Sequence, residues 1–189
     1  MSSGSMHAFA VPVFVRALRN LRGVLEIGEK FAADKGIAPE VMLQTRLVPD
    51  MLPLVRQVQI ACDFAKSVPA RLAGEDVPVY DDTEENFGQL RARIARTLPF
   101  ADSLQAAQFE GGEQREIVLR PGTPKERKLD GRTYLLNYGL PQFFFHVTTA
   151  YDLLRLVRHS QHAVMAIDVF PQVPLECQVL LGDVVRKRN

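Results

Sequence analysis

Apolar residues recur at steps of three and four along the first part of the chain. Between Phe9 and Lys35, charged residues such as Arg16 and Glu26 separate them, and this spacing predicts a long amphipathic helix. Gly36 comes next as a stop signal, because glycine adopts the left-handed conformation at a helix C-terminus at little cost. The apolar stripe comprises Val11, Phe14, Leu18, Leu21 and Leu25.

Two further segments show the same periodicity. In the first, Asp50 can cap a helix that runs to about Leu72. In the second, Asp82 and Glu85 have the spacing of a capping box, and we expect this helix to fray near Pro99. The stripes are Met51, Leu54 or Val55, Val58, Cys62 and Ala65 in the first segment, and Phe87, Leu90, Ile94 and Leu98 in the second.

A hairpin and a fourth helix are expected next. Residues 115–119 alternate polar and apolar, residues 120–124 have turn chemistry, and residues 125–129 supply a return strand. Residues 131–155 then keep helical phase, and Pro141 should kink the axis. The stripe of this helix is Tyr134, Tyr138, Phe145 and Tyr151 or Leu154. Since no strand alternates with each helix, the fold class is mainly α, a four-helix bundle with a small β-hairpin before the last helix.

The regular pattern loosens toward the end of the chain. Residues 163–170 are mostly apolar but lack helical phase, and Pro171 and Pro174 interrupt the residues after them. We therefore expect residues 1–156 to form the bundle and residues 157–189 to be a divergent C-terminal tail outside the fold.

The charges of the chain nearly cancel, with 23 Lys and Arg against 22 Asp and Glu among 189 residues. Such a balance gives the surface no reason to attract nucleic acid. The longest stretch without a formal charge, Thr133–Tyr151, holds Asn137, Gln142 and His146, which argue against a membrane span. Because there is no secretory signal and only two cysteines, we expect a soluble cytoplasmic protein.

Four histidines are the first candidates for a metal centre. A straight helix would place His146 and His159 about 20 Å apart, too far to share an ion. His159 and His162 are three residues apart without a carboxylate or cysteine nearby, which is a weak metal signal. Cys62 continues an apolar stripe, so we expect it to pack rather than react. The sequence thus predicts no metal, no cofactor and no assigned catalytic residue.

Two interpretations of His146, which lies in an aromatic segment, remain open. In one, it is a core histidine that hydrogen-bonds to a neighbour. In the other, packing of the second and fourth helices brings Gln57 or Gln59 toward His146 and forms a polar pocket. Tyr151 would add a hydroxyl, and Asp50 shares a helix face with Gln57. The candidate ligand-binding residues are His146, Gln57, Gln59, Tyr151 and Asp50.

Several stretches of the sequence, in order and at consistent spacing over roughly residues 5–156, resemble an uncharacterised bacterial family. It is the domain of unknown function numbered nineteen-ninety-three, within the DinB/YfiT-like helical-bundle superfamily. The resemblance implies a four-helix bundle, and the function of the family is not established. The stretches are Val11-Pro12-Val13-Phe14, Leu18-Arg19-Asn20-Leu21, Pro49-Asp50-Met51, Gln57-Val58-Gln59-Ile60-Ala61 and Phe144-Phe145-His146-Val147-Thr148-Thr149-Ala150-Tyr151.

The same resemblance bears on metal chemistry. Relatives in the superfamily often bind a divalent ion through three histidines, one from the second helix and two spaced four apart on the last, and some are thiol transferases or hydrolases. Here His146 is similar to one of the last-helix pair. Its positions four away are Gln142 and Ala150, and the second helix offers Gln57 or Gln59. Two of the three expected ligands are missing.

Three hypotheses arise from the sequence. The first is a small-ligand-binding or structural bundle, a homodimer with a degenerate metal site around His146. The alternative is a metal-dependent transferase or hydrolase of the DinB/YfiT-like kind that uses His146 with weaker ligands such as Asp50 or Asp63. A third is an interaction module whose helix surfaces recruit another protein.

Overall fold

The computed structural model describes residues 3–158. The predicted tail, residues 157–189, lies almost wholly outside the described residues, as do His159, His162 and Cys177, so the boundary at residue 156 stays a prediction. In the described part, no helix is both long and apolar enough to cross a membrane. The elements are α1 (Ser3–Lys35), α2 (Pro39–Leu43), α3 (Leu54–Ala73), α4 (Phe87–Ser103), the 3-10 turn η1 (Ala106–Phe109), β1 (Glu116–Leu119), β2 (Arg127–Asp130), α5 (Gly131–Thr133), the π-helical turn η2 (Tyr134–Gly139) and α6 (Leu140–Arg158).

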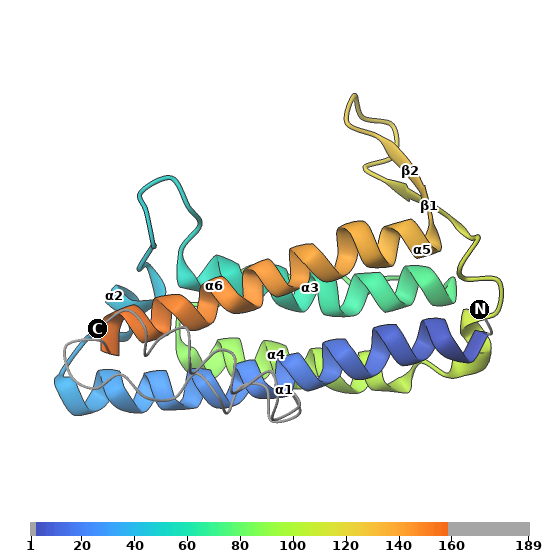
Figure 1. Ribbon diagram of the computed structural model, residues 1–189. Helices are drawn as coiled ribbons and strands as arrows, with labels where there is room; N and C mark the ends of the chain where they lie inside the picture. Colours follow the sequence, from blue (N-terminus) through green and yellow to red (C-terminus); the bar gives the residue numbers. More distant parts are fainter. Residues whose placement is uncertain (1–2, 159–189) are drawn as a thin grey trace, which may run out of the picture. The chain divides into compact units, whose positions relative to one another are not determined.

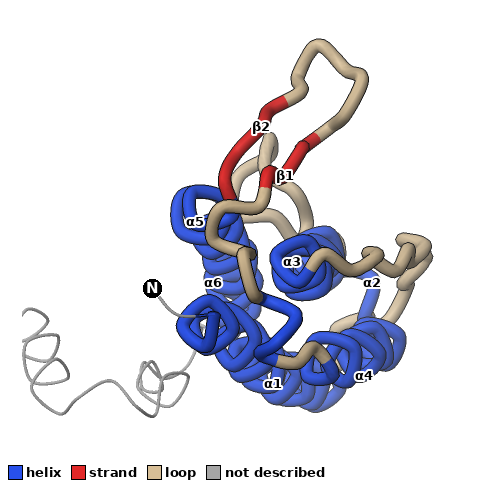
Figure 2. The backbone as a smooth tube through the Cα atoms, turned by 90° about the vertical axis from the view of Figure 1, so that its right-hand side faces the viewer, coloured by secondary structure: helices blue, strands red, loops and turns tan. Residues whose placement is uncertain are grey.

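Four long helices, α1, α3, α4 and α6, run side by side, as Figures 1 and 2 show. Helix α3 packs against α6 and α4, and α1 packs against α4, α6 and α3. The two strands form a separate antiparallel hairpin that projects from the bundle just before the last helix (Figure 2). The predicted fold class, a four-helix bundle with a small hairpin before the last helix, is confirmed.

The stripes predicted from the sequence form a large part of the core, together with buried residues outside them such as Phe109 and Phe143. All five residues of the α1 stripe are buried, and Phe14 meets Phe143 of α6 edge to face, with ring centroids 4.6 Å apart. Burying a side chain of this size contributes about 1.5–3 kcal/mol, so each residue of the stripes adds substantially to the driving force for packing. Two members were misplaced: Phe145, expected in the α6 stripe, is 52% exposed, and Met51, expected in the α3 stripe, lies in the turn before that helix.

Two predicted helix starts were wrong. Helix α3 begins at Leu54 with the extended residue Pro53 as its N-cap, and Asp50 lies in the exposed turn before it. Helix α4 begins after Asn86, whose side chain accepts a hydrogen bond of 2.9 Å from the backbone N–H of Gln89. Asp82 does not cap this helix, because its carboxylate pairs with arginines.

Proline acts differently in the third and fourth predicted helices. Helix α4 continues through Pro99 to Ser103 rather than fraying, since an interior proline removes one N–H donor without necessarily ending a helix. Ahead of Pro141, the last helix widens into the π-helical turn η2, in which the N–H of Leu140 donates to the carbonyl of Leu135. The wider turn offers space for a ring that would otherwise crowd the carbonyl four residues earlier.

Alternate residues of β1 pack the hairpin against the bundle. Ile117 and Leu119 of β1 are buried against the bundle, whereas Glu116 is exposed and pairs with Lys128 of β2 at 3.2 Å. At the connection between the strands, Arg120 and Gly122 adopt positive φ angles of 52° and 72°. Arg120 is the only non-glycine residue with positive φ in the described part, where such a conformation is uncommon for a residue with a Cβ.

Candidate functional site

The second and last long helices bring His146 and Gln57 into direct contact. Nδ1 of His146 lies 2.7 Å from Oε1 of Gln57, and both side chains are buried. The amide nitrogen of Gln57 donates to the backbone carbonyl of Leu52 at 2.9 Å, which fixes the orientation of the amide. With Oε1 as the acceptor, Nδ1 of His146 carries the proton and Nε2 carries the lone pair. The pair is therefore polar, oriented and satisfied on the Nδ1 side.

Aromatic rings surround His146. The ring of Phe64 stacks on it at a centroid distance of 6.0 Å, and the exposed ring of Phe145 meets it edge to face at 5.1 Å. Phe64 also packs against Tyr138, 5.8 Å away. This setting holds the imidazole by apolar contacts on more than one side while 8% of the residue stays exposed.

Burial lowers the pKa of His146 below its ordinary value of 6.5. An imidazolium in this apolar setting would lose hydration without gaining a carboxylate partner. The ring is therefore neutral at pH 7, with a free lone pair for a hydrogen bond or a proton.

This pKa shift predicts a pH dependence of stability. Because the unfolded chain takes up a proton near pH 6.5 and the folded chain only at lower pH, stability should fall as the pH drops below 6.5. Between pH 7.5 and 5.5, the wild type should lose more thermal stability than His146→Gln, measured by circular dichroism. Equal pH profiles for the wild type and His146→Gln would refute the prediction.

The other predicted site residues have different surroundings. Gln59 is buried but faces the loop after α3, where its amide nitrogen donates to Glu84 at 2.7 Å and its oxygen accepts from Arg56 at 2.7 Å. Tyr151 is half-buried on α6, with the Arg155 guanidinium 6.0 Å from its ring centre. Asp50 is exposed in the turn before α3. Of the five candidates, His146 and Gln57 are joined by a direct hydrogen bond.

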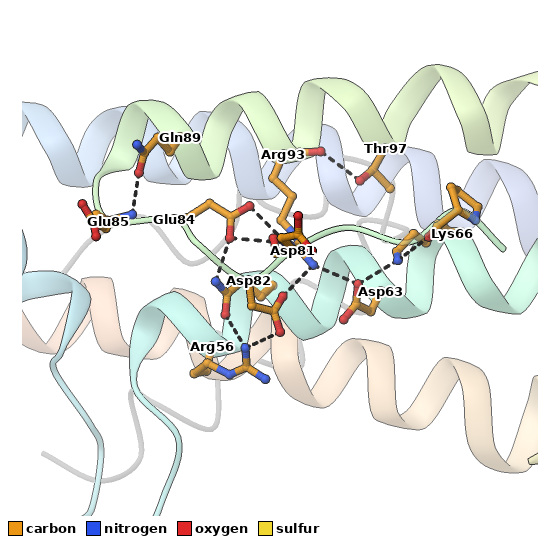
Figure 3. Close-up of polar contacts among 12 residues, drawn as sticks. Arg56, Asp63, Lys66, Asp81, Asp82, Glu84, Glu85, Gln89, Arg93 and Thr97 are labelled. Carbon is orange, nitrogen blue, oxygen red and sulfur yellow. Dashed lines mark hydrogen bonds and ion pairs between the residues drawn. The ribbon is translucent and has the colours of Figure 1, made fainter. Parts of the chain in front are cut away.

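A second polar centre, which the sequence pattern did not predict, surrounds Arg93 of α4 (Figure 3). Its side chain is 1% exposed and its Nη atoms contact three carboxylates, those of Asp63, Asp82 and Glu84, each at 3.0 Å. Nη1 also donates to the backbone carbonyl of Asp81 at 2.9 Å. We call Arg93 with these three carboxylates and Arg56 and Lys66 the Arg93 cluster. It fastens the loop between α3 and α4 to both helices.

The charges of the Arg93 cluster balance. Burial alone would raise the pKa of Asp82, but the hydrogen bond and charge of Arg56, together with Arg93, hold that pKa below its usual range. Lys66 pairs with Asp63 at 3.1 Å and donates to the carbonyl of Pro78 at 2.7 Å. Only Nε of Arg93 is buried without a partner among the described side-chain atoms. The arrangement is that of a structural ion network rather than of an open active site.

Cys62 lies beside this cluster. Burial raises the pKa of its thiol to about 12, although the nearby Arg93 charge and a hydrogen bond with Thr97 act in the opposite direction. The thiolate is the reactive form of cysteine, so this residue is inert at neutral pH.

The residues around His146 do not fit a divalent-ion centre. The side chain of Gln57, on the helix that supplies one histidine in metal-binding relatives, bonds directly to the imidazole and leaves no room for an ion between them. Gln142 and Ala150 occupy the positions four residues from His146. Asp63, considered above as a weaker ligand, belongs to the Arg93 cluster. Residues 3–158 contain no group of three His, Cys, Asp or Glu side chains that could hold a metal.

The four-helix bundle with a hairpin before the last helix is a DinB-like fold. Residues 6–157 match the family described as "Domain of unknown function (DUF1993)", and the chain belongs to this family. It is similar to the crystal structure of a DinB family member protein from Shewanella denitrificans, with a TM-score of 0.81 and 34% identity over 91% of this chain and 95% of that one. No curated protein matches the chain.

Proposed function

We propose that this protein is a small-molecule-binding bundle that works without a divalent metal, with His146 and Gln57 as its polar contacts. The observation that carries the proposal is the 2.7 Å hydrogen bond between His146 Nδ1 and Gln57 Oε1. This bond occupies Nδ1 of His146 and the side-chain amide of Gln57, so these two groups bind each other rather than an ion. A core histidine would make the same bond, and what favours a ligand site is the ring of Phe145, which is 52% exposed and lies beside the imidazole.

The chemistry of the pair defines what a ligand must offer. His146 is neutral with its lone pair on Nε2, so it accepts a hydrogen bond from a hydroxyl or N–H group. Phe145, 52% exposed and edge-on to the imidazole, supplies an apolar contact beside it. These groups suit a neutral ligand with an apolar body and one hydrogen-bond donor.

The metal part of the proposal has a direct test. Protein purified without chelators or affinity metal should contain no stoichiometric divalent ion by mass spectrometry, and Zn²⁺, Ni²⁺ or Mn²⁺ should not raise its melting temperature. The matched variants are His146→Ala and His7→Ala. A stoichiometric ion that is lost in His146→Ala but retained in His7→Ala would contradict the proposal and support the metal-dependent transferase or hydrolase alternative.

The ligand part is tested with neutral fragments. A library of small alcohols and amides with aromatic bodies, screened by ligand-observed NMR, should yield binders that shift the His146 imidazole signals and lose binding in His146→Phe. If no fragment depends on His146, the small-molecule-binding function is wrong. Sedimentation of the same samples would show whether the predicted homodimer forms.

A further inference from the structure

A groove of about 590 Å³ lies between the hairpin connection and the start of the last helix. Its hairpin side carries Arg120, Lys125 and Arg127, and its helix side carries Tyr138 of η2 and Gln142 of α6. This volume is within the range of small-molecule sites. The groove does not include His146 or Gln57, so it is a separate place on the bundle and stands whether or not the proposed function above is correct.

The charges in the groove are one-sided. Three cationic side chains line it, and within the described residues none of them makes an ion pair. The one carboxylate, Glu126, accepts a hydrogen bond of 2.8 Å from the backbone N–H of Gly122 and so serves the turn itself. With three cations against one carboxylate, the groove carries a net positive charge.

The backbone is irregular on both sides of the groove. Arg120 holds a left-handed conformation with φ of 52°, which is costly for a residue with a Cβ, and the turn keeps an arginine where glycine would be easier. Opposite, Tyr138 belongs to the π-helical turn η2. Strained residues and π-helical turns concentrate at binding sites. Arg120 and Tyr138, one from each irregular segment, both line the groove.

An aromatic surface completes the groove. The ring centroid of Tyr138 lies 5.9 Å from that of Tyr134 and 5.8 Å from that of Phe64, and these two contacts fix the position of the ring. Leu119 and Pro124 add apolar contacts from the hairpin. We propose that the groove binds a small organic anion, with a flat apolar body against Tyr138 and a carboxylate or phosphate ester against Arg120, Lys125 and Arg127. Guanidinium groups suit both oxyanions, since each can be held by two parallel hydrogen bonds.

The test uses phenyl phosphate and benzoate as probes, with benzyl alcohol as the neutral analogue and inorganic phosphate as the anion without a ring. Calorimetric titration of the full chain at low salt should detect at least one of the two organic anions, more tightly than either control. Binding should weaken as salt is raised. The stronger of phenyl phosphate and benzoate identifies the oxyanion.

Variants separate the groove from general surface charge. Arg120→Gly and Arg127→Gln should each weaken binding at least tenfold, and Arg120→Gly should do so without lowering the melting temperature, because glycine relieves the left-handed strain. The matched control is Lys128→Gln, which removes the same charge from the same strand outside the groove. Equal binding of benzyl alcohol, an equal loss in Lys128→Gln, or no binding of either organic anion would overturn the proposal.

Discussion

Replacing Arg93 with methionine is expected to lower the free energy of unfolding by about 3 kcal/mol. The side chain of Arg93 is 1% exposed and neutralises Asp63, Asp82 and Glu84 across the seam between α3, α4 and their connecting loop. Without the guanidinium, these carboxylates face one another with Lys66 and Arg56 only at the edges. The loss should be at the low end for a broken buried ion pair, since Asp63 and Asp82 are 41% and 36% exposed.

Urea denaturation at pH 7 measures this loss, and Arg56→Met is the matched control. Arg56 carries the same charge in the same cluster but is 38% exposed, so its removal should cost about 1 kcal/mol or less. Adding Glu84→Gln to Arg93→Met should recover part of the stability, because it removes the most buried of the three carboxylates. Similar losses for Arg93→Met and Arg56→Met would show that burial of Arg93 does not set its contribution.

The burial of Arg93 has a signal in the sequence, whereas its partners do not. Arg93 lies three residues after Leu90 and directly before Ile94, so helical phase puts it on the buried face of α4. A charged residue on such a face requires partners. Its partners Asp82 and Glu84 come from the connecting loop, whose path no periodicity describes, and the spacing of Asp82 favoured a helix cap instead.

The pairing of His146 shows where sequence reasoning stops. The packing of the second and last helices was predicted, but the choice between Gln57 and Gln59 was not. Two residues apart on a helix, their side chains point about 200° apart, so only one can face the last helix. Gln57 meets His146, and Gln59 meets Arg56 and Glu84. The rotation of α3 about its axis decides this, and it depends on packing against three helices together.

Element types and the ends of α1 and α3 were predictable because each depends on local pattern, whereas the starts of α3 and α4 were not. The buried stripe of α1 and the Pro-Gly turn of the hairpin are local signals. The start of α3 depends instead on the N–H of Leu54 donating to the distant carbonyl of Thr45, which draws the chain past Asp50 before the helix begins. Such long-range contacts can move the start of a helix away from the capping residue that the sequence offers.

Replacing Gly131 with alanine is expected to destabilise the fold by about 3 kcal/mol or more. Gly131 begins the last helical segment, and a Cβ there would overlap the carbonyl oxygen of Gly112 and lie 3.0 Å from a methyl group of Leu72. Neither the backbone at Gly131 nor the backbone at Gly112 can move away easily. The N–H of Arg132 donates to the carbonyl of Glu113 at 3.0 Å, and a Cβ on Gly112 would itself meet the Leu72 carbonyl at 2.8 Å.

Gly23→Ala is the matched control, because the same substitution at that position should stabilise the protein. Gly23 lies inside α1 with no neighbouring atom within 4 Å of the place that an alanine Cβ would take, so alanine should stabilise the helix by about 0.5–1 kcal/mol. Urea denaturation compares the two variants with the wild type. Because Gly131 joins the hairpin to the last helix, its replacement should also disturb the Tyr138 ring signals in NMR, whereas Gly23→Ala should leave them unchanged. A stable Gly131→Ala variant with an unaltered Tyr138 environment would show that the close approach of Gly131 to Gly112 is not needed to hold the hairpin against the last helix.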